Sequence, residues 1–246
     1  MNNFLQYAIK IIAIVLALMG AKAGFGTENS CEARSGTQLN PVVELYTSEG
    51  CSSCPPADRW LSGLKSARDR GGAVVQAFHV GYWDYIGWAD RFATPSHTQR
   101  QRHIAARNGQ RSIYTPQVVR HGQDWRDWSS ALDVGAAARA SLVVRRTGAD
   151  TFEAVVTPRD PQARWSAYWT VTEDGHSTRV KAGENDGETL RHDHVVRQYT
   201  PVGDYQGSRV LTFSSVARDP THPRRVNLVV TEPGGGATLQ ALGLGC

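Results

Sequence analysis

Two cysteines separated by two serines carry the clearest chemical signal in the sequence. Cys51 and Cys54 follow an apolar run at residues 41–47 and precede Pro55 and Pro56. A strand that leads into a helix would place Cys51 at the helix N-terminus, where unpaired N–H groups and the helix dipole stabilise a thiolate. Proline suits that first turn, because its missing N–H would have no partner there. The pattern predicts a thiol pair in which Cys51 attacks and Cys54 resolves.

Two other interpretations of the pair stay open. The first is a static disulfide, although a bridge across only two intervening residues is strained and easily reduced. The second is half of a metal site, since soft thiolates bind copper(I) and a histidine could complete the ligand set. His79 and His103 are the candidates to approach the cysteines, although neither is expected to do so.

Glu44 is a further candidate for a catalytic role. It lies inside the apolar run, where a buried carboxylate is costly unless it has a partner or a task. It could carry the proton of Cys54. The slightly favoured interpretation is that Glu44 points outward or pairs with an arginine. Glu49, two residues before Cys51, is expected to be solvated.

The elements expected around the cysteines alternate between strand and helix. The order is strand 41–47, helix 55–69, strand 73–80, helix 95–107, strand 117–120 and a helix near 129–140. Crossover helices imply a parallel core sheet. A CxxC pair in this context is typical of thioredoxin-like redox proteins. Residues 24–140 are therefore predicted to form a thioredoxin-like α/β domain with a βαβαβα core.

Thr115-Pro116 stands where the last predicted strand begins. Proline removes a hydrogen-bond donor from a sheet and is tolerated only at special positions. Thioredoxin-like proteins carry a cis-proline at this place, packed against the CxxC pair, with the preceding residue available to substrate peptide. That likeness favours a cis bond over the commoner trans form. It assigns Pro116 to the docking groove and Thr115 to substrate binding.

Aromatic and imidazole side chains form two further groups. The stretch 81–88 is rich in aromatic residues, and Tyr82 and Trp83 could form a substrate-facing lip. Packing within the core and loops is the commoner role for such a cluster. His192 and His194 would share one face of a strand, and a polar, exposed face is expected there because a metal site needs more ligands.

The chain after residue 140 has a different pattern. Strand-like runs alternate with turns, and several runs alternate apolar and polar residues, as in half-exposed antiparallel strands. Residues 141–246 are therefore predicted to form a separate β-rich module. The expected strands are 142–146, 151–157, 165–172, 194–199, 209–216 and 224–231.

The N-terminal segment has the pattern of a secretory signal. Lys10 precedes a short apolar run, and small residues follow near position 23, so residues 1–23 are predicted to be cleaved. An uncleaved anchor is the alternative. A periplasmic or secreted location, without membrane attachment after cleavage, follows. The segment carries Lys10 and Lys22 and no acidic residue, so its removal lowers the net charge of +4 by two. The resulting near-neutral charge argues against nucleic acid as a partner.

Cys31 and Cys246 lie near the two ends of the mature chain. An exported protein can form disulfides, and the simplest pairing joins these two and leaves Cys51 with Cys54. A free or intermolecular Cys246 is the alternative. Closing so long a loop would constrain the unfolded chain by about 4–5 kcal/mol.

Several segments together form a pattern that is specific to one family. They are 43–58, His79-Val80, Tyr82-Trp83-Asp84, Gly87-Trp88, Arg100-Gln101, 114–117 and Gly183-Glu184-Asn185. With these residues the sequence resembles a secreted bacterial family known as domain of unknown function 1223. The resemblance covers nearly the whole mature chain and implies a thioredoxin-like fold with a β-rich second half, but no reaction.

The leading functional hypothesis is a thiol–disulfide oxidoreductase that acts on a protein thiol or disulfide through Cys51 and Cys54. It needs no dissociable cofactor. The alternatives are a copper(I)-handling protein that uses the two thiolates, and a redox-inactive module that binds a partner.

Overall fold

The computed structural model describes residues 31–70, 72–128, 132 and 135–246, and residues 31–246 form one compact unit. The helices are α2 (Pro55–Gly63), α3 (Lys65–Asp69), the single-turn η1 (Asp84–Ile86) and α4 (Pro95–Arg107). The strands are β1 (Glu32–Arg34), β2 (Val42–Thr47), β3 (Val74–His79), β4 (Gln117–Arg120), β5 (Gln123–Asp124), β6 (Ala140–Arg146), β7 (Thr151–Pro158), β8 (Arg164–Glu173), β9 (His176–Arg179), β10 (Thr189–His192), β11 (Val195–Gln206), β12 (Arg209–Ser214), β13 (Arg224–Thr231) and β14 (Thr238–Leu244).

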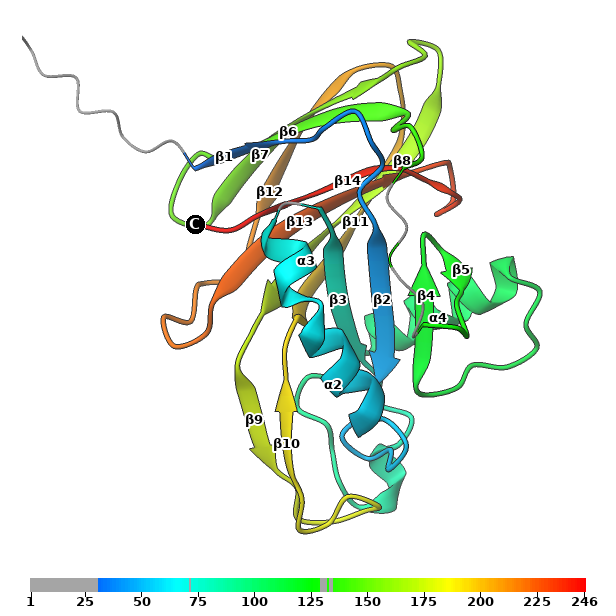
Figure 1. Ribbon diagram of the computed structural model, residues 1–246, viewed down its shortest axis with the longest axis vertical. Helices are drawn as coiled ribbons and strands as arrows, with labels where there is room; N and C mark the ends of the chain where they lie inside the picture. The colour runs from blue at the N-terminus through cyan, green and yellow to red at the C-terminus, as the bar shows by residue number, and fades with distance from the viewer. Residues whose placement is uncertain (1–30, 71, 129–131, 133–134) are drawn as a thin grey trace, which may run out of the picture. The chain divides into compact units, whose positions relative to one another are not determined.

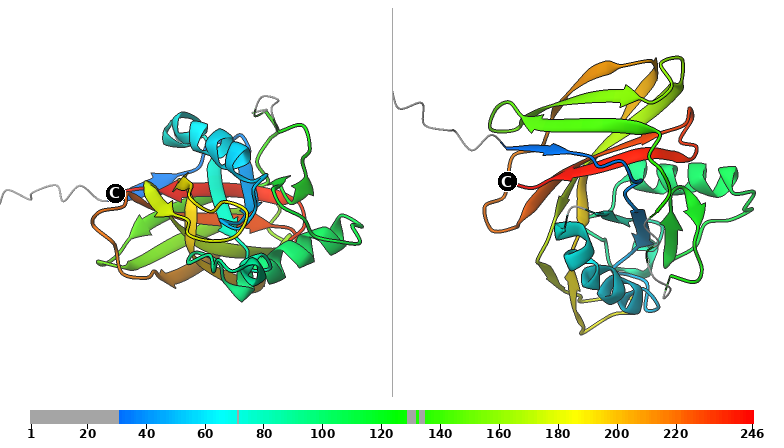
Figure 2. Two further views of the ribbon diagram at one scale, coloured as in Figure 1. Left: turned by 90° about the horizontal axis from the view of Figure 1, so that it is seen from below. Right: turned by 45° about the horizontal axis from the view of Figure 1, so that its top comes forward.

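The largest sheet has eight strands in the order β14-β13-β8-β11-β3-β2-β4-β5. Its strands β2 and β3 are parallel and completely buried, which explains their continuous apolar runs. Helices α2 and α3 cover one face of these strands and α4 covers the other (Figures 1 and 2). The parallel pair therefore lies between two helical layers, and the CxxC loop leaves the carboxyl end of β2.

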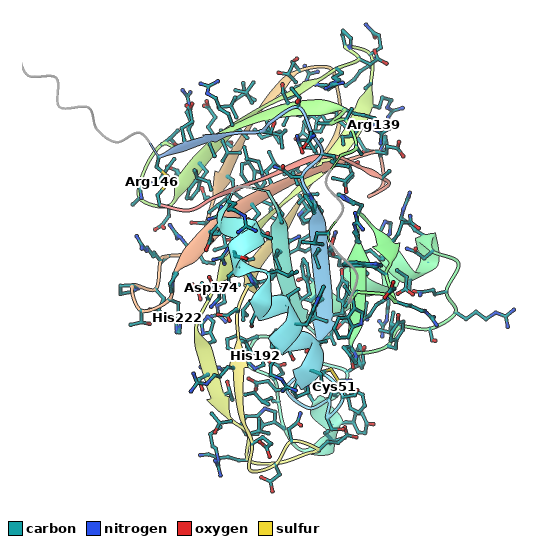
Figure 3. All side chains as sticks on the ribbon, viewed as in Figure 1. Cys51, Arg139, Arg146, Asp174, His192 and His222 are labelled. Carbon is teal, nitrogen blue, oxygen red and sulfur yellow. A yellow bond between two sulfur atoms is a disulfide. The ribbon has the colours of Figure 1, made fainter. Side chains whose placement is uncertain are left out.

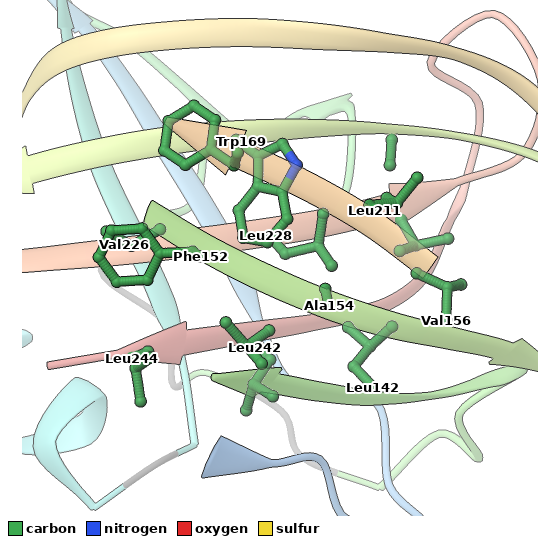
Figure 4. Close-up of a cluster of buried hydrophobic side chains, with 14 of the residues drawn as sticks. Leu142, Phe152, Ala154, Val156, Trp169, Leu211, Val226, Leu228, Leu242 and Leu244 are labelled. Carbon is green, nitrogen blue, oxygen red and sulfur yellow. The ribbon is translucent and has the colours of Figure 1, made fainter. Parts of the chain in front are cut away.

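A second sheet, in the order β1-β6-β7-β12, packs on the antiparallel part of the large sheet. The side chains between them form the largest apolar core, which includes Trp169 (Figure 4). The rings of Trp169 and Phe213 stack there with centroids 5.1 Å apart. The alternating buried and exposed residues of β7 show why this sheet has one apolar face.

The predicted fold class, a thioredoxin-like βαβαβα core with a separate β module, is wrong. Strand β4 pairs antiparallel with β2, so the core sheet is not parallel throughout. The strands after residue 140 extend the same sheet, because β11 pairs with β3 on one side and with β8 on the other. Strands dominate the described residues, and helices are few.

The helix expected near 129–140 also differs. Residues 135–139 are not helical, and β6 begins at Ala140; residues 129–131 and 133–134 lie outside the described part. The boundary predicted near residue 140 coincides with the start of β6, but strands from both sides of it build the eight-stranded sheet.

The predicted bridge between Cys31 and Cys246 is confirmed, with Cα atoms 6.1 Å apart. It ties the start of β1 to the end of the chain beyond β14. The two disulfides indicate an oxidising, non-cytoplasmic compartment. The predicted signal segment, residues 1–23, lies outside the described residues. None of the helices in the described residues is long and apolar enough to cross a membrane.

Candidate active site

Cys51 and Cys54 form a disulfide at the N-terminus of α2, with Cα atoms 5.5 Å apart (Figure 3). Cys54 is the N-cap and has helical dihedral angles, and prolines occupy the first helical positions, as predicted. Cys51 Sγ lies 3.3 Å from Ser53 Oγ. Both cysteines have 0% of their surface exposed, whereas Ser52 and Ser53 are exposed.

Two residues of the segment between β9 and β10 hydrogen-bond to the CxxC loop. Asn185 Nδ2 donates to the carbonyl oxygens of Glu49 at 2.8 Å and Cys51 at 3.1 Å. The Glu184 carboxylate accepts from the backbone N–H of Ser52 at 2.9 Å and from its hydroxyl at 2.7 Å. These two hydrogen bonds lower the pKa of the exposed Glu184 carboxyl. The loop shape thus depends on residues more than 130 positions away in sequence.

The aromatic stretch packs against the same loop. A Cβ atom at Gly50 would lie 3.0 Å from Cβ of Trp83, so the loop needs glycine at that point. Trp83 Nε1 donates to Thr115 Oγ1 at 2.8 Å, which joins the stretch to the Thr115–Pro116 bond. That bond is cis, as predicted. The residues predicted to bind substrate, Tyr82, Trp83 and Thr115, therefore lie close to one another, and their contact with a substrate stays a prediction.

A buried polar cluster lies beneath the loop. His79 Nδ1 and Asp90 Oδ2 are 2.7 Å apart, and both side chains are fully buried. Asp90 also accepts from the backbone N–H of Glu49 at 2.9 Å. His192 Nε2 lies 3.3 Å from Glu49 Oε1, an ion-pair distance, without the angle of a hydrogen bond. The last member, Asp58 of α2, accepts from Thr47 Oγ1 at 3.0 Å.

The cluster members shift one another's protonation. Burial opposes charge on His79, but the Asp90 carboxylate outweighs it and raises the pKa of His79. Burial likewise opposes charge on Asp90, and His79 lowers the pKa of Asp90 to about 2. For Asp58 burial dominates and raises the pKa of the carboxyl. Burial also opposes charge on Glu49, but the neighbouring His192 helps to outweigh it, and the pKa of Glu49 is lowered. The cluster thus combines the His79–Asp90 ion pair with one carboxyl, that of Asp58, biased toward its acid form.

The structure corrects the predicted surroundings of three polar residues. Glu49 is fully buried, so the expectation that it is solvated is wrong. His192 and His194 are buried as well, so the exposed polar face is wrong: His192 belongs to the cluster, and His194 Nδ1 lies 3.1 Å from Arg68 Nη1. His103 is exposed and its Nε2 lies 2.8 Å from the carbonyl oxygen of Gly234.

Glu44 is engaged elsewhere. Its carboxylate accepts from Arg100 at 2.7 and 2.9 Å, from Tyr46 at 2.8 Å and from Tyr168 at 3.0 Å. The arginine pairing that the sequence favoured is confirmed. All four contacts stabilise the carboxylate where it lies, which argues against its use as a proton carrier for Cys54.

The described residues contain no group of three His, Cys, Asp or Glu side chains arranged to hold a metal ion.

Sequence reasoning assigned no site role to Asp58, Asp90 or Asn185, although Asp58 and Asn185 lie in segments that carry the family resemblance. For Asp58 a second signal is its spacing, four residues after Cys54 on a predicted helix. No local spacing marks Asp90 or Asn185, which approach from distant segments.

Comparisons with known proteins agree on the fold. A family model described as "Protein of unknown function (DUF1223)" matches residues 42–231. The structure is similar to that of protein AGR_C_4864 from Agrobacterium tumefaciens, with TM-score 0.62, 23% identity and coverage of 85% of this chain and 96% of that chain. It is also similar to HBP35 of Porphyromonas gingivalis, with TM-score 0.56, 17% identity and coverage of 85% and 76%. No curated protein matches the sequence.

Proposed function

We propose that this chain, which belongs to the family described as Protein of unknown function (DUF1223), is a thiol–disulfide oxidoreductase. In this proposal one thiolate of a partner dithiol attacks Cys51, Cys54 leaves as a thiolate, and the partner's second thiol resolves the mixed disulfide. In the opposite direction the Cys51 thiolate of the reduced pair attacks a partner disulfide, and Cys54 resolves the mixed disulfide and re-forms the bridge. The observation that supports this proposal most strongly is the disulfide between Cys51 and Cys54 at the N-terminus of α2. The positive end of the helix dipole there favours a thiolate when the bridge is reduced.

Loop length supports a chemical rather than a structural role for this bridge. Its cysteines are 3 residues apart, against 215 for the Cys31–Cys246 bridge. In the chain-entropy model the short loop stabilises the fold by about 2 kcal/mol and the long loop by about 5 kcal/mol. The long bridge already ties the two ends of the unit together, so the short one adds little stability.

Access to Cys51 is part of the proposal. The sulfur is buried in the oxidised protein, so the proposal requires the CxxC loop, whose exposed Ser52 contacts Glu184, to move when a partner binds. Tyr82 and Trp83 would then line the partner's path, Thr115 would bind partner backbone, and Pro116 would shape the groove. The proposed location is the periplasm or the exterior, reached through cleavage of residues 1–23.

The test is the reduction potential of the Cys51–Cys54 pair, measured by alkylation after equilibration in graded thiol buffers. A value between about −120 and −220 mV is expected, as in exchanging disulfides. A value below about −300 mV marks a structural bridge and overturns the proposal. Cys54→Ser should accumulate mixed disulfides with partners, and Cys51→Ser should accumulate none.

The binding-module alternative is favoured by one observation, the complete burial of both sulfurs. A cavity of about 450 Å³ between α4 and the antiparallel strands, lined by Arg100, His103, Tyr168 and Tyr199, would be its binding surface. In that case partner affinity would be the same in Cys51→Ser, Cys54→Ser and wild-type protein.

A further inference from the structure

Any exchange at the Cys51–Cys54 bridge has to move protons as well as electrons. When a thiolate attacks Cys51, the S–S bond breaks and its electron pair leaves on Cys54 as a thiolate. Cys54 is fully buried, and a buried thiolate is unstable unless a neighbour protonates or neutralises it. A buried acid close to Cys54 would therefore assist both directions of the reaction.

Asp58 occupies the position such an acid needs. Its backbone N–H donates to the carbonyl oxygen of Cys54 at 3.1 Å, and Cys54 already has helical dihedral angles. Residues four apart on a helix lie on one face with neighbouring Cβ atoms, so Asp58 stands one turn below Cys54 on the same face. Both side chains are buried.

The carboxyl of Asp58 is free to change its charge. In the described part of the chain the one hydrogen bond that this carboxyl accepts comes from Thr47, and no Lys or Arg forms an ion pair with it. This contrasts with Glu44, which Arg100 holds through two contacts. The groups that act on Asp58 come from three other segments: His79 of β3 and His192 of β10 favour its carboxylate, whereas Asp90, after η1, and burial favour its acid form.

A route to solvent is also present. A cavity of about 160 Å³ beside α2 is lined by Pro55, Asp58, His192 and the exposed arginines Arg59 and Arg191. His192 is 3% exposed, and neither of its ring nitrogens has a hydrogen-bond partner among the described residues. Figure 3 shows His192 beside α2, the helix that Cys51 precedes. Protons can thus pass between the cavity and Asp58.

We propose that Asp58 is the proton-transfer residue of the Cys51–Cys54 pair, an inference that rests on the oxidoreductase function proposed above. On reduction the Asp58 carboxylic acid gives its proton to the departing Cys54 thiolate and is recharged through the cavity. On oxidation the Asp58 carboxylate takes the proton of the Cys54 thiol, and the resulting thiolate attacks the mixed disulfide at Cys51. The partner is then released as a thiolate.

The attack of Cys54 on the mixed disulfide can be timed separately in the full-length protein in which the Cys51–Cys54 bridge is reduced and the Cys31–Cys246 bridge is intact. An aromatic disulfide reagent reacts with Cys51 and releases one coloured thiolate, and attack by Cys54 then releases a second. Asp58→Asn should slow the second release about 10²-fold near neutral pH, the ordinary size of such a proton transfer. The difference should vanish above the pKa of the Cys54 thiol, because the thiolate then forms without help. Thr47→Val, which keeps the carboxyl but removes its hydrogen bond, should move the midpoint of the rate profile to higher pH.

Asp174→Asn is the matched control, since Asp174 is 7% exposed and Asp58 is 8% exposed. It should leave the second release unchanged, with folding checked by circular dichroism. An equal second rate in Asp58→Asn and wild type, or a deficit of the same size at every pH, would overturn the assignment of Asp58. Failure of the wild-type protein to release either thiolate would instead overturn the oxidoreductase function, and this inference with it.

Discussion

Asn185 donates from its side-chain amide to the carbonyl oxygen of Cys51, across 134 residues of sequence. The same amide nitrogen donates to the carbonyl oxygen of Glu49. Asn185 is buried, so it closes the CxxC loop as an internal part of the fold and not as a surface contact. The conformation of the cysteine loop is therefore coupled to the β9–β10 connection.

Asn185→Ala should destabilise the protein by about 1–3 kcal/mol, because the carbonyl of Glu49 loses its partner in a buried site. It should also speed reduction of the Cys51–Cys54 bridge by a small dithiol, since the loop opens more easily. Urea unfolding and timed alkylation measure the two effects. Asp186→Ala, an exposed change at the next residue, is the control. Equal stability of the Asn185 variant and wild type would contradict the structural role.

Arg100 and Glu44 form a buried ion pair, and the loss of one partner should lower the free energy of unfolding. Arg100→Met leaves the Glu44 carboxylate buried without its cation and should destabilise the fold by about 3–5 kcal/mol. Combining it with Glu44→Gln should restore much of the loss, because no unpaired charge then remains. Denaturant unfolding of both variants with the disulfides intact decides this. A double variant less stable than Arg100→Met alone would be the opposite result.

The sequence predicts those elements of the fold that leave a pattern of apolar and polar residues within a short stretch of chain. The buried runs of β2 and β3 and the alternating strands β6 and β7 are recognisable in the sequence, because burial on both faces or on one face leaves a direct pattern of apolar residues. Strands β9 and β10 were missed, since His176–Arg179 and Thr189–His192 are mostly polar. The joining of the two halves through β11 was missed because strand pairing over such distances leaves no local pattern.

The candidate site likewise has a part that leaves a local sequence pattern and a part that does not. Cys51, Cys54 and the cis bond before Pro116 were predicted from types and order in the chain. The buried cluster was not, because His and Glu are usually exposed and a single sequence does not mark the exceptions. Glu49 and His192 are such exceptions: each is buried because the other, from a distant segment, lies opposite it.

Acid should destabilise the protein through its buried histidines. Burial lowers the pKa values of His97, His121 and His194 to about 4. The unfolded chain binds these protons near pH 6.5, so between about 6.5 and 4 it holds more protons than the folded chain and stability falls as the pH falls. His79, whose pKa is raised, acts in the opposite sense: its contribution is complete below pH 6.5 and is lost as the pH rises through its folded value.

His97→Gln isolates one of these groups. A full shift of this size corresponds to about 3 kcal/mol at the acid end of the window. The variant should therefore lose less stability than wild type between pH 7 and pH 4.5, as measured by urea unfolding at each pH. His103→Gln, an exposed change, should follow the wild-type curve. Identical pH dependence of His97→Gln and wild type would show that His97 does not contribute.

The two disulfides should differ sharply in what they add to stability. Replacing Cys31 and Cys246 together by serine releases a loop of 215 residues and should cost about 5 kcal/mol, whereas replacing Cys51 and Cys54 releases a loop of 3 and should cost about 2 kcal/mol. Urea unfolding of the two double variants gives the comparison, with wild type in an oxidising buffer as reference. A short-loop variant that loses as much stability as the long-loop variant would mean that Cys51–Cys54 is a structural bridge. A small loss there, together with intact folding, leaves thiol chemistry as the reason for placing two cysteines at the start of α2.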